Sequence, residues 1–156
     1  MADLIFRRAT EADVPAIIGL LADDVLGSSR EMTGPESHAR YLNAFRVIDA
    51  DVNQVLLVVA DGSMIVGTLQ LTFIAGLARG GLKRGQIEAV RVAGDRRGEK
   101  IGEAMFAWAL EKCRSEHCGI VQLTTDKART EAHRFYDRLG FEPSHIGYKM
   151  NLQRAR

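Results

Sequence analysis

Six short segments of this sequence either alternate apolar and polar residues or run apolar residues together, and both patterns are typical of β-strands. The six segments are residues 4–8, 54–60, 64–75, 87–92, 120–125 and 146–152. In four other segments apolar residues return every three or four positions, which is the spacing of one face of an α-helix. The predicted helices follow Thr10, begin at Pro35, cover residues 101–113 and end just before Gly140.

The predicted elements follow the order β-α-α-β-β-β-α-β-α-β, which indicates an α/β (α+β) fold with a mixed central sheet and helices on both faces. The apolar face of the first helix is predicted at Val14, Ile17, Ile18, Leu21 and Val25. The glycine-rich, basic residues 76–85 predict a flexible hairpin loop, with a mobile flap as the alternative. Residues 1–156 suffice for one sizeable core, so we expect a single domain.

Composition narrows the functional classes. The chain has 21 basic and 20 acidic residues, which gives no general attraction to nucleic acids or membranes. We find neither an apolar signal core at the N-terminus nor an apolar run long enough to span a bilayer. Cys113, Cys118 and the four histidines lack metal-ligand spacing. We therefore expect a cytoplasmic protein without a metal, in which both cysteines are buried and reduced.

The candidate chemistry begins in the stretch QIEAVRVAGDRRGEKIGEAMFAW, residues 86–108, which predicts a strand, a glycine-bearing turn and a helix. The first N–H groups of a helix lack partners and its dipole is positive there, so such a turn can hold a phosphate. Gly98 and Gly102 allow close approach, and Arg96, Arg97 and Lys100 add positive charge. On spacing alone, an ordinary strand–loop–helix connection explains the turn equally well.

Two motifs carry a family resemblance. Residues 97–102, RGEKIG, resemble the [RQ]xxGx[GA] pyrophosphate loop of the GNAT superfamily of acetyl-CoA-dependent N-acetyltransferases, except that Lys100 replaces a usual glycine. Residues 132–141, AHRFYDRLGF, are similar to the GNAT pattern AxxFYxxLGF. The resemblance implies a mostly antiparallel sheet and acetyl-CoA as the acetyl donor. It implies acetyl-CoA contacts at Val90, Arg91, Val92, Arg97, Gly98, Glu99, Lys100, Ile101, Gly102 and Arg129, the last where many members carry asparagine.

Glu88 is an acid within an otherwise apolar strand, which makes it a candidate general base for an amine acceptor. Burial would raise the pKa of its carboxyl group toward a useful range. The alternative is an acid paired with Arg91 or another base. The resemblance supports catalysis at Glu88, and it implies that Tyr136 protonates the departing CoA thiolate; otherwise Tyr136 is a core tyrosine.

Asp23, Asp24 and Glu31 gather acidic charge at the break between the first two helices. They form either a solvated helix end or a lip that attracts a cationic substrate, and the resemblance favours the acceptor for this region. The expected activity is direct acetyl transfer to a primary amine, a small molecule in preference to a protein lysine or N-terminus. A CoA-binding regulatory domain without turnover is the other alternative. Relatives often form homodimers, so a homodimer is possible.

Overall fold

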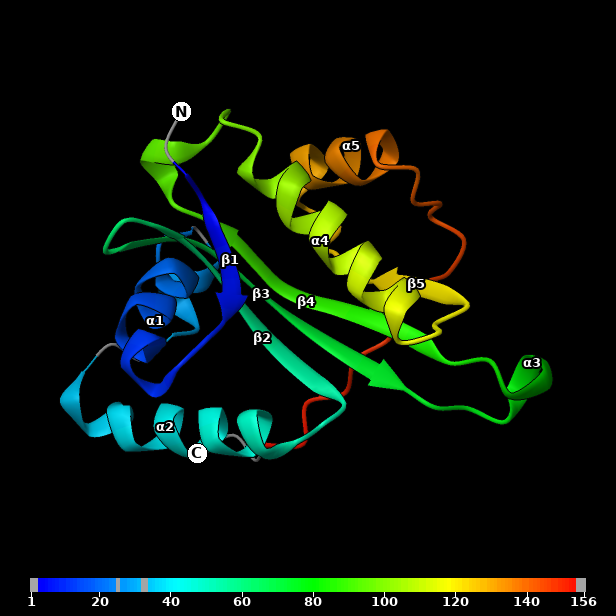
Figure 1. Ribbon diagram of the computed structural model, residues 1–156, viewed down its shortest axis with the longest axis horizontal. Helices are drawn as coiled ribbons and strands as arrows, with labels where there is room; N and C mark the ends of the chain where they lie inside the picture. Colours follow the sequence, from blue (N-terminus) through cyan, green and yellow to red (C-terminus); the bar gives the residue numbers. More distant parts are fainter. Residues whose placement is uncertain (1–2, 25, 32–33, 154–156) are drawn as a thin grey trace. The chain divides into compact units, whose positions relative to one another are not determined.

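The computed structural model describes residues 3–24, 26–31 and 34–153, which fall into two compact units. The first unit ends at Leu123 and the second begins at Thr124. Figure 1 gives the element labels used from here on.

The first unit is built on one five-stranded sheet with strand order β1-β2-β3-β4-β5. The strands are β1 (Ile5–Arg8), β2 (Gln54–Asp61), β3 (Met64–Ile74), β4 (Arg84–Val92) and β5 (Ile120–Leu123). The first three pairings are antiparallel, and only β4 with β5 is parallel. This confirms the mixed, mostly antiparallel sheet. The loop expected at 76–85 is the β3–β4 connection, with a single turn at α3 (Ala78–Gly81), and β4 begins three residues earlier than predicted.

Three longer helices belong to the first unit: α1 (Val14–Ala22), α2 (Pro35–Ala50) and α4 (Ile101–Ser115). A 3-10 turn, η1 (Glu11–Asp13), leads into α1, and Thr10 and Asp13 form a capping box at its start. The first helix ends at Ala22, earlier than its apolar pattern suggests, and a second 3-10 turn, η2 (Gly27–Ser29), follows. Val25, which the prediction placed on this helix, lies outside the described residues.

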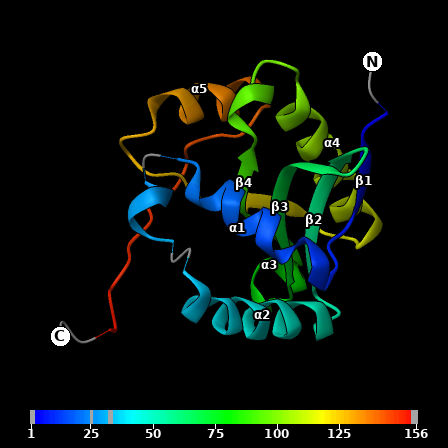
Figure 2. The ribbon, with the colours of Figure 1, turned by 90° about the vertical axis from the view of Figure 1, so that its left-hand side faces the viewer.

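The helices cover opposite faces of the sheet. Alternate residues of β2 and β3, including Leu56, Thr68 and Gln70, lie on the same side as α1 and α2. Figure 2 shows α1 crossing the middle of the view and α2 running below it. On the other side, a Cβ added at Gly67 would lie 2.9 Å from Sδ of Met105, so α4 approaches the sheet closely there.

In the second unit, α5 (Thr130–Arg138) ends as its sequence predicts. Gly140 has φ of 88°, and its N–H donates to Asp137 O at 3.0 Å while the Phe141 N–H donates to Tyr136 O at 3.1 Å. These two bonds form a Schellman motif, in which a left-handed glycine ends the helix. The Tyr136 and Phe141 rings, 6.2 Å apart, supply the hydrophobic contact that accompanies the motif.

The strand predicted at 146–152 is wrong. This segment has no regular structure, and its alternate apolar residues are 72–91% exposed: Ile146, Tyr148, Met150 and Leu152. A strand needs a neighbouring strand to satisfy its backbone N–H and C=O groups. No ladder includes this segment in the described part of the chain. The alternation is therefore real in the sequence, but it is not sufficient to form a strand.

Candidate functional site

The backbone of β4 is interrupted next to Glu88. Gln70 of β3 pairs with Glu88 and Thr68 pairs with Arg91, so one residue of β3 faces two residues of β4. The extra residue makes a β-bulge, and Ala89 within it has φ of 53°. A left-handed conformation is costly for a residue with a Cβ, and such strain concentrates at functional sites.

The same part of β4 also loses its second neighbour. The parallel ladder between β4 and β5 ends at the pair Ile87 and Leu123. Within the described part of the chain, residues 88–92 therefore pair with β3 alone. Backbone groups on the outer edge of this stretch have no strand to bind, so a ligand can use them. This edge includes Val90, Arg91 and Val92, the residues expected to contact acetyl-CoA.

Glu88 shares a sheet face with α1 and α2, because it pairs directly with Gln70, which lies on that face. Its side chain is exposed, so the condition of burial that the sequence argument invoked for this carboxyl group is not met. Arg91 does not pair with it either: Nη2 of Arg91 lies 3.1 Å from Oδ2 of Asp24. Among residues 3–24, 26–31 and 34–153, Glu88 has no ion-pair partner, which leaves its carboxylate accessible to a substrate or water.

The loop between β4 and α4 has the shape expected for binding an anion. After a 3-10 turn, η3 (Gly94–Arg96), the chain has positive φ at Gly98 (88°) and Lys100 (62°) and then enters α4. Lys100 thus adopts a left-handed conformation that glycine adopts at lower cost, which explains why related loops carry glycine there. The first free N–H groups of α4 follow at once, including that of Gly102.

The three basic residues of this loop differ in whether they form ion pairs. Nη1 of Arg96 lies 2.7 Å from Oδ2 of Asp61, the last residue of β2, and its Nε lies 2.9 Å from Oε2 of Glu99. These bonds, with Asp61 first, raise the pKa of Arg96. The ion pair with Arg96 also fixes the Glu99 carboxylate. Arg96 therefore stabilises the conformation of the loop and is not the free cation that the sequence suggested. Arg97 and Lys100 are exposed and form no ion pair within the described residues.

The structure brings only part of the acidic cluster to this site. Asp23 lies beside the loop, since a Cβ at Gly94 would be 3.3 Å from its Oδ2. Asp24 instead binds Arg91, and both side chains are largely buried, with 11% and 15% exposure. The Tyr41 hydroxyl donates to Oε2 of Glu31 at 2.6 Å, which holds Glu31 to α2. The cluster is therefore mainly a set of structural contacts, and Asp23 is its accessible member.

An apolar cavity of about 180 Å³ lies between α1, α2 and the sheet. It extends to Ala89, the bulge residue next to Glu88. The sequence prediction missed this cavity, because periodicity assigns Ile17, Tyr41 and Phe45 to buried helix faces without showing how closely those faces pack. A small residue at Ala44, within an otherwise bulky helix face, is the one sequence signal of unfilled space.

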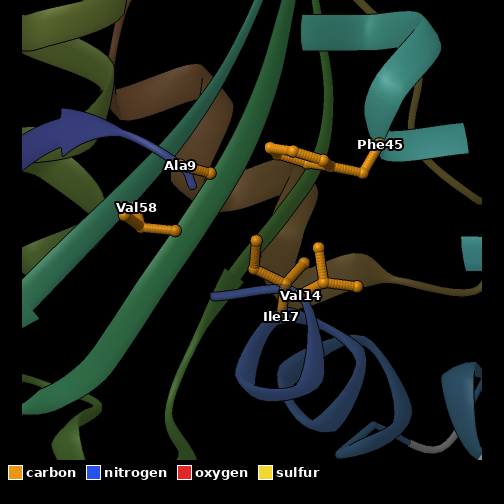
Figure 3. Packing of buried hydrophobic residues seen from close by; sticks show 5 residues of the cluster. All are labelled: Ala9, Val14, Ile17, Phe45 and Val58. Atoms are coloured by element: carbon orange, nitrogen blue, oxygen red, sulfur yellow. The ribbon is translucent and has the colours of Figure 1, made fainter. Parts of the chain in front are cut away.

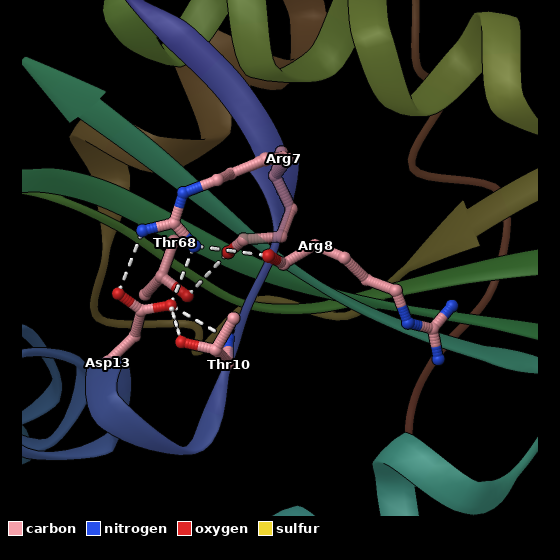
Figure 4. A network of polar contacts seen from close by, with 6 residues as sticks. Arg7, Arg8, Thr10, Asp13 and Thr68 are labelled. Carbon is pink, nitrogen blue, oxygen red and sulfur yellow. Dashed lines mark hydrogen bonds and ion pairs between the residues drawn. The ribbon is translucent and has the colours of Figure 1, made fainter.

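A polar network fixes the start of α1 and thus one wall of the cavity (Figure 4). Asp13 accepts bonds from Arg7 at 2.7 and 2.9 Å and from the N–H and Oγ1 of Thr10 at 2.7 and 3.0 Å. The Arg7 bonds are the largest cause that lowers the pKa of Asp13 to about 2. Thr68, in the same figure, donates its hydroxyl to Leu57 O at 2.8 Å.

Tyr136 and Arg129 belong to the second unit. Tyr136 is half-buried on α5, and its ring stands edge-on to those of Phe135 and Phe141. Arg129 is the residue that immediately precedes α5. Their expected roles toward acetyl-CoA stay predictions, as do those of the loop residues.

The described residues give no evidence for nucleophilic catalysis by Cys113, for a metal-binding cluster or for a membrane-spanning helix. Burial, followed by the neighbouring Cys118, raises the pKa of the Cys113 thiol to about 12, so this thiol is not ionised near neutral pH. No cluster of three histidine, cysteine, aspartate or glutamate residues is arranged to hold a metal within the described ranges. No helix in that part of the chain combines the length and apolarity needed to cross a bilayer.

Comparison with known proteins assigns the chain to a family. Residues 22–141 match the model of the acetyltransferase (GNAT) family. The chain is 39% identical over 68 residues to the aminoalkylphosphonate N-acetyltransferase of Salmonella typhimurium. That match covers 44% of each protein, so it spans less than half of the relative's length.

Two solved structures have the same fold over nearly the whole chain. A transcriptional regulator from Bacillus halodurans C-125 is 43% identical, with a TM-score of 0.93 over 96% of this chain and 100% of that one. An acetyltransferase of Trypanosoma brucei is 26% identical, with a TM-score of 0.79 over 96% of this chain and all of that one. The chain belongs to the acetyltransferase (GNAT) family.

Proposed function

We propose that this protein transfers an acetyl group from acetyl-CoA directly to the primary amine of a small molecule, with both substrates bound at once. The observation that carries the proposal is the juxtaposition, in one unit, of the open edge of β4 and the N-terminus of α4. In this proposal, the pyrophosphate binds the N–H groups at residues 98–102 with Arg97 nearby. The acetyl thioester lies along residues 90–92, and the contact of Arg129 with acetyl-CoA stays a separate expectation from the family resemblance.

The chemistry requires a base, because an alkylamine has a pKa of about 10 and is protonated at neutral pH. Glu88 accepts this proton directly or through water, which its exposed position permits. The amine nitrogen then attacks the carbonyl carbon, and a backbone N–H of residues 90–92 stabilises the charge on the oxygen. The nitrogen, cationic after the attack, loses its second proton to solvent as the bond to sulfur breaks. Tyr136 donates a proton to the CoA thiolate, as the family resemblance implies, and takes one back from solvent.

Glu88→Gln tests this assignment, because it keeps the shape of the side chain and removes the base. We expect turnover to fall roughly 10²–10⁴-fold, the usual contribution of a positioned acid or base. Acetyl-CoA affinity, measured by calorimetry, should be unchanged. The defect should shrink as pH rises, since more amine is then deprotonated before binding. Glu111→Gln, an exposed acid on α4 beside Arg114, is the matched control and should keep full activity.

The resemblance to a transcriptional regulator supports a second candidate, a CoA-binding domain without turnover. Thiol release from acetyl-CoA with a panel of amines separates the two. Amine-dependent release that Glu88→Gln abolishes supports the enzyme. Tight acetyl-CoA binding with no release for small amines, lysine peptides or N-terminal peptides supports the regulatory domain and contradicts our proposal.

A further inference from the structure

We infer that the cavity between α1, α2 and the sheet binds an apolar substituent of the acceptor, so the substrate class is primary amines with a compact hydrocarbon group. Arylalkylamines and branched alkylamines fit this description. Amines with a phosphonate or carboxylate group do not. The inference rests on the proposed function, since it names the acceptor that the same site would select.

Size and lining favour a hydrocarbon. The cavity measures about 180 Å³. Engineered cavities of roughly 150 Å³ lined by Leu, Ile and Phe stay dry and bind benzene. The walls here are of the same kind, with Val14, Ile17 and Leu56 among them, and Phe45 closes the side toward α2 (Figure 3).

The few polar atoms in the walls are already engaged. Thr68 donates its hydroxyl to Leu57 O at 2.8 Å, and the amide of Gln70 donates to Oε1 of Gln54 at 2.9 Å. Tyr41 donates its hydroxyl to Glu31. No lysine or arginine lines the cavity within the described part of the chain. A phosphonate or carboxylate placed there would lose its hydration without gaining a cation, which is strongly unfavourable.

The position of the cavity connects this specificity to the reaction. Ala89 forms part of the wall, and Glu88 precedes it on the same face of the sheet as Gln70. An amine whose hydrocarbon group fills the cavity would therefore direct its nitrogen toward Glu88 and the open edge of β4. The exposed carboxylate of Glu88, next to the cavity wall at Ala89, would attract the ammonium form of the acceptor.

Steady-state kinetics of thiol release with three amines test the inference: 2-phenylethylamine, ethylamine and 2-aminoethylphosphonate. We expect kcat/KM for 2-phenylethylamine to exceed both others by roughly 10–100-fold, since a filled apolar pocket discriminates by this order. Ala44→Phe narrows the cavity, and Ile17→Phe fills it from α1 if the first variant proves too mild. Either should lower the preference for 2-phenylethylamine over ethylamine at least tenfold. Ala39→Phe, exposed on α2 and outside the cavity lining, is the matched control and should keep it.

Binding of toluene to the intact protein, followed by thermal shift, distinguishes failure of this inference from failure of the proposed function. A rise in Tm that Ala44→Phe or Ile17→Phe removes, without acetylation of any amine, supports the apolar site and contradicts the enzyme. Efficient acetylation of 2-aminoethylphosphonate with no response to either filling variant supports the enzyme and overturns the inference. No effect of toluene combined with equal rates for all three amines also overturns it.

Discussion

The two faces of the sheet are stabilised in different ways. On the α4 face, side chains of the central strands are essentially inaccessible, with 0–1% exposure for Leu57, Leu69, Leu71 and Ile87. They meet a stripe of α4 residues spaced four apart, from Ile101 to Cys113, which is equally buried. On the opposite face, α1 and α2 border a partly open cavity of about 180 Å³.

Polar contacts surround the α1–α2 face of the sheet (the hollow face), where apolar packing is incomplete. Arg7 and Asp13 fix the start of α1, Arg91 and Asp24 fix the chain just beyond its end, and Arg46 with Glu11 joins α2 to η1. Such contacts can hold a wall in position without filling the space behind it. The difference between the faces suggests that the α4 face is the more closely packed, whereas the α1–α2 face keeps a cavity beside its own buried cluster of Val14, Ile17, Phe45 and Val58.

Truncating one buried side chain on each face should give the largest predicted changes in the free energy of unfolding. Leu71→Ala should lower the free energy of unfolding by about 3–5 kcal/mol, because a fully packed site cannot relax around the lost atoms. Ile17→Ala should cost about 1 kcal/mol less, since Ile17 already borders unfilled space. Urea unfolding at neutral pH measures both. Equal losses would show that the two faces are packed alike.

Removing a polar anchor from the hollow face should have an intermediate, pH-dependent effect. The pKa of Asp13 is lowered from 3.8 to about 2, so its ionised form stabilises the fold at neutral pH by about 2 kcal/mol. This stabilisation is complete above the unfolded pKa of 3.8 and disappears as pH falls through about 2. Asp13→Asn should therefore lower stability at pH 7, and its deficit relative to the natural protein should vanish near pH 2.

Asp51→Asn is the control for this prediction. Asp51 is an acid near the end of α2, and hydrogen bonds from Gln54 and Asn53 lower its pKa, but no cation pairs with it in the described residues. Its replacement should change stability less than Asp13→Asn at pH 7. A deficit of Asp13→Asn that persists unchanged at pH 2 would mean that packing, and not the charge on Asp13, anchors α1.

The sequence predicts the packed face better than the hollow one. The strand–loop–helix predicted over residues 87–113 forms, with the strand beginning earlier, at Arg84, and the helix ending later, at Ser115, because its apolar stripe and its glycine-bearing turn are local signals. The bulge at Ala89 and the Asp24–Arg91 pair depend on contacts between distant segments, so periodicity does not report them. The same limit explains the wrong strand at 146–152, where the alternation is present and the partner strand is not.

The smallest effect concerns Lys100, where the well-packed helix α4 begins in a strained conformation. Lys100→Gly should raise stability by about 0.5–1 kcal/mol, because relief of the left-handed backbone outweighs the greater chain entropy of glycine when unfolded. Lys112→Gly, in the same helix but with helical geometry, should instead lower stability by about 1 kcal/mol.

Calorimetry with acetyl-CoA at two salt concentrations measures whether the Lys100 side chain contributes to binding. If only the backbone N–H of residue 100 meets the pyrophosphate, Lys100→Gly should bind within about threefold of the natural protein at both. A larger loss, accompanied by weaker salt dependence, would show that the ammonium group binds the phosphate and that the strain at Lys100 is kept for its charge.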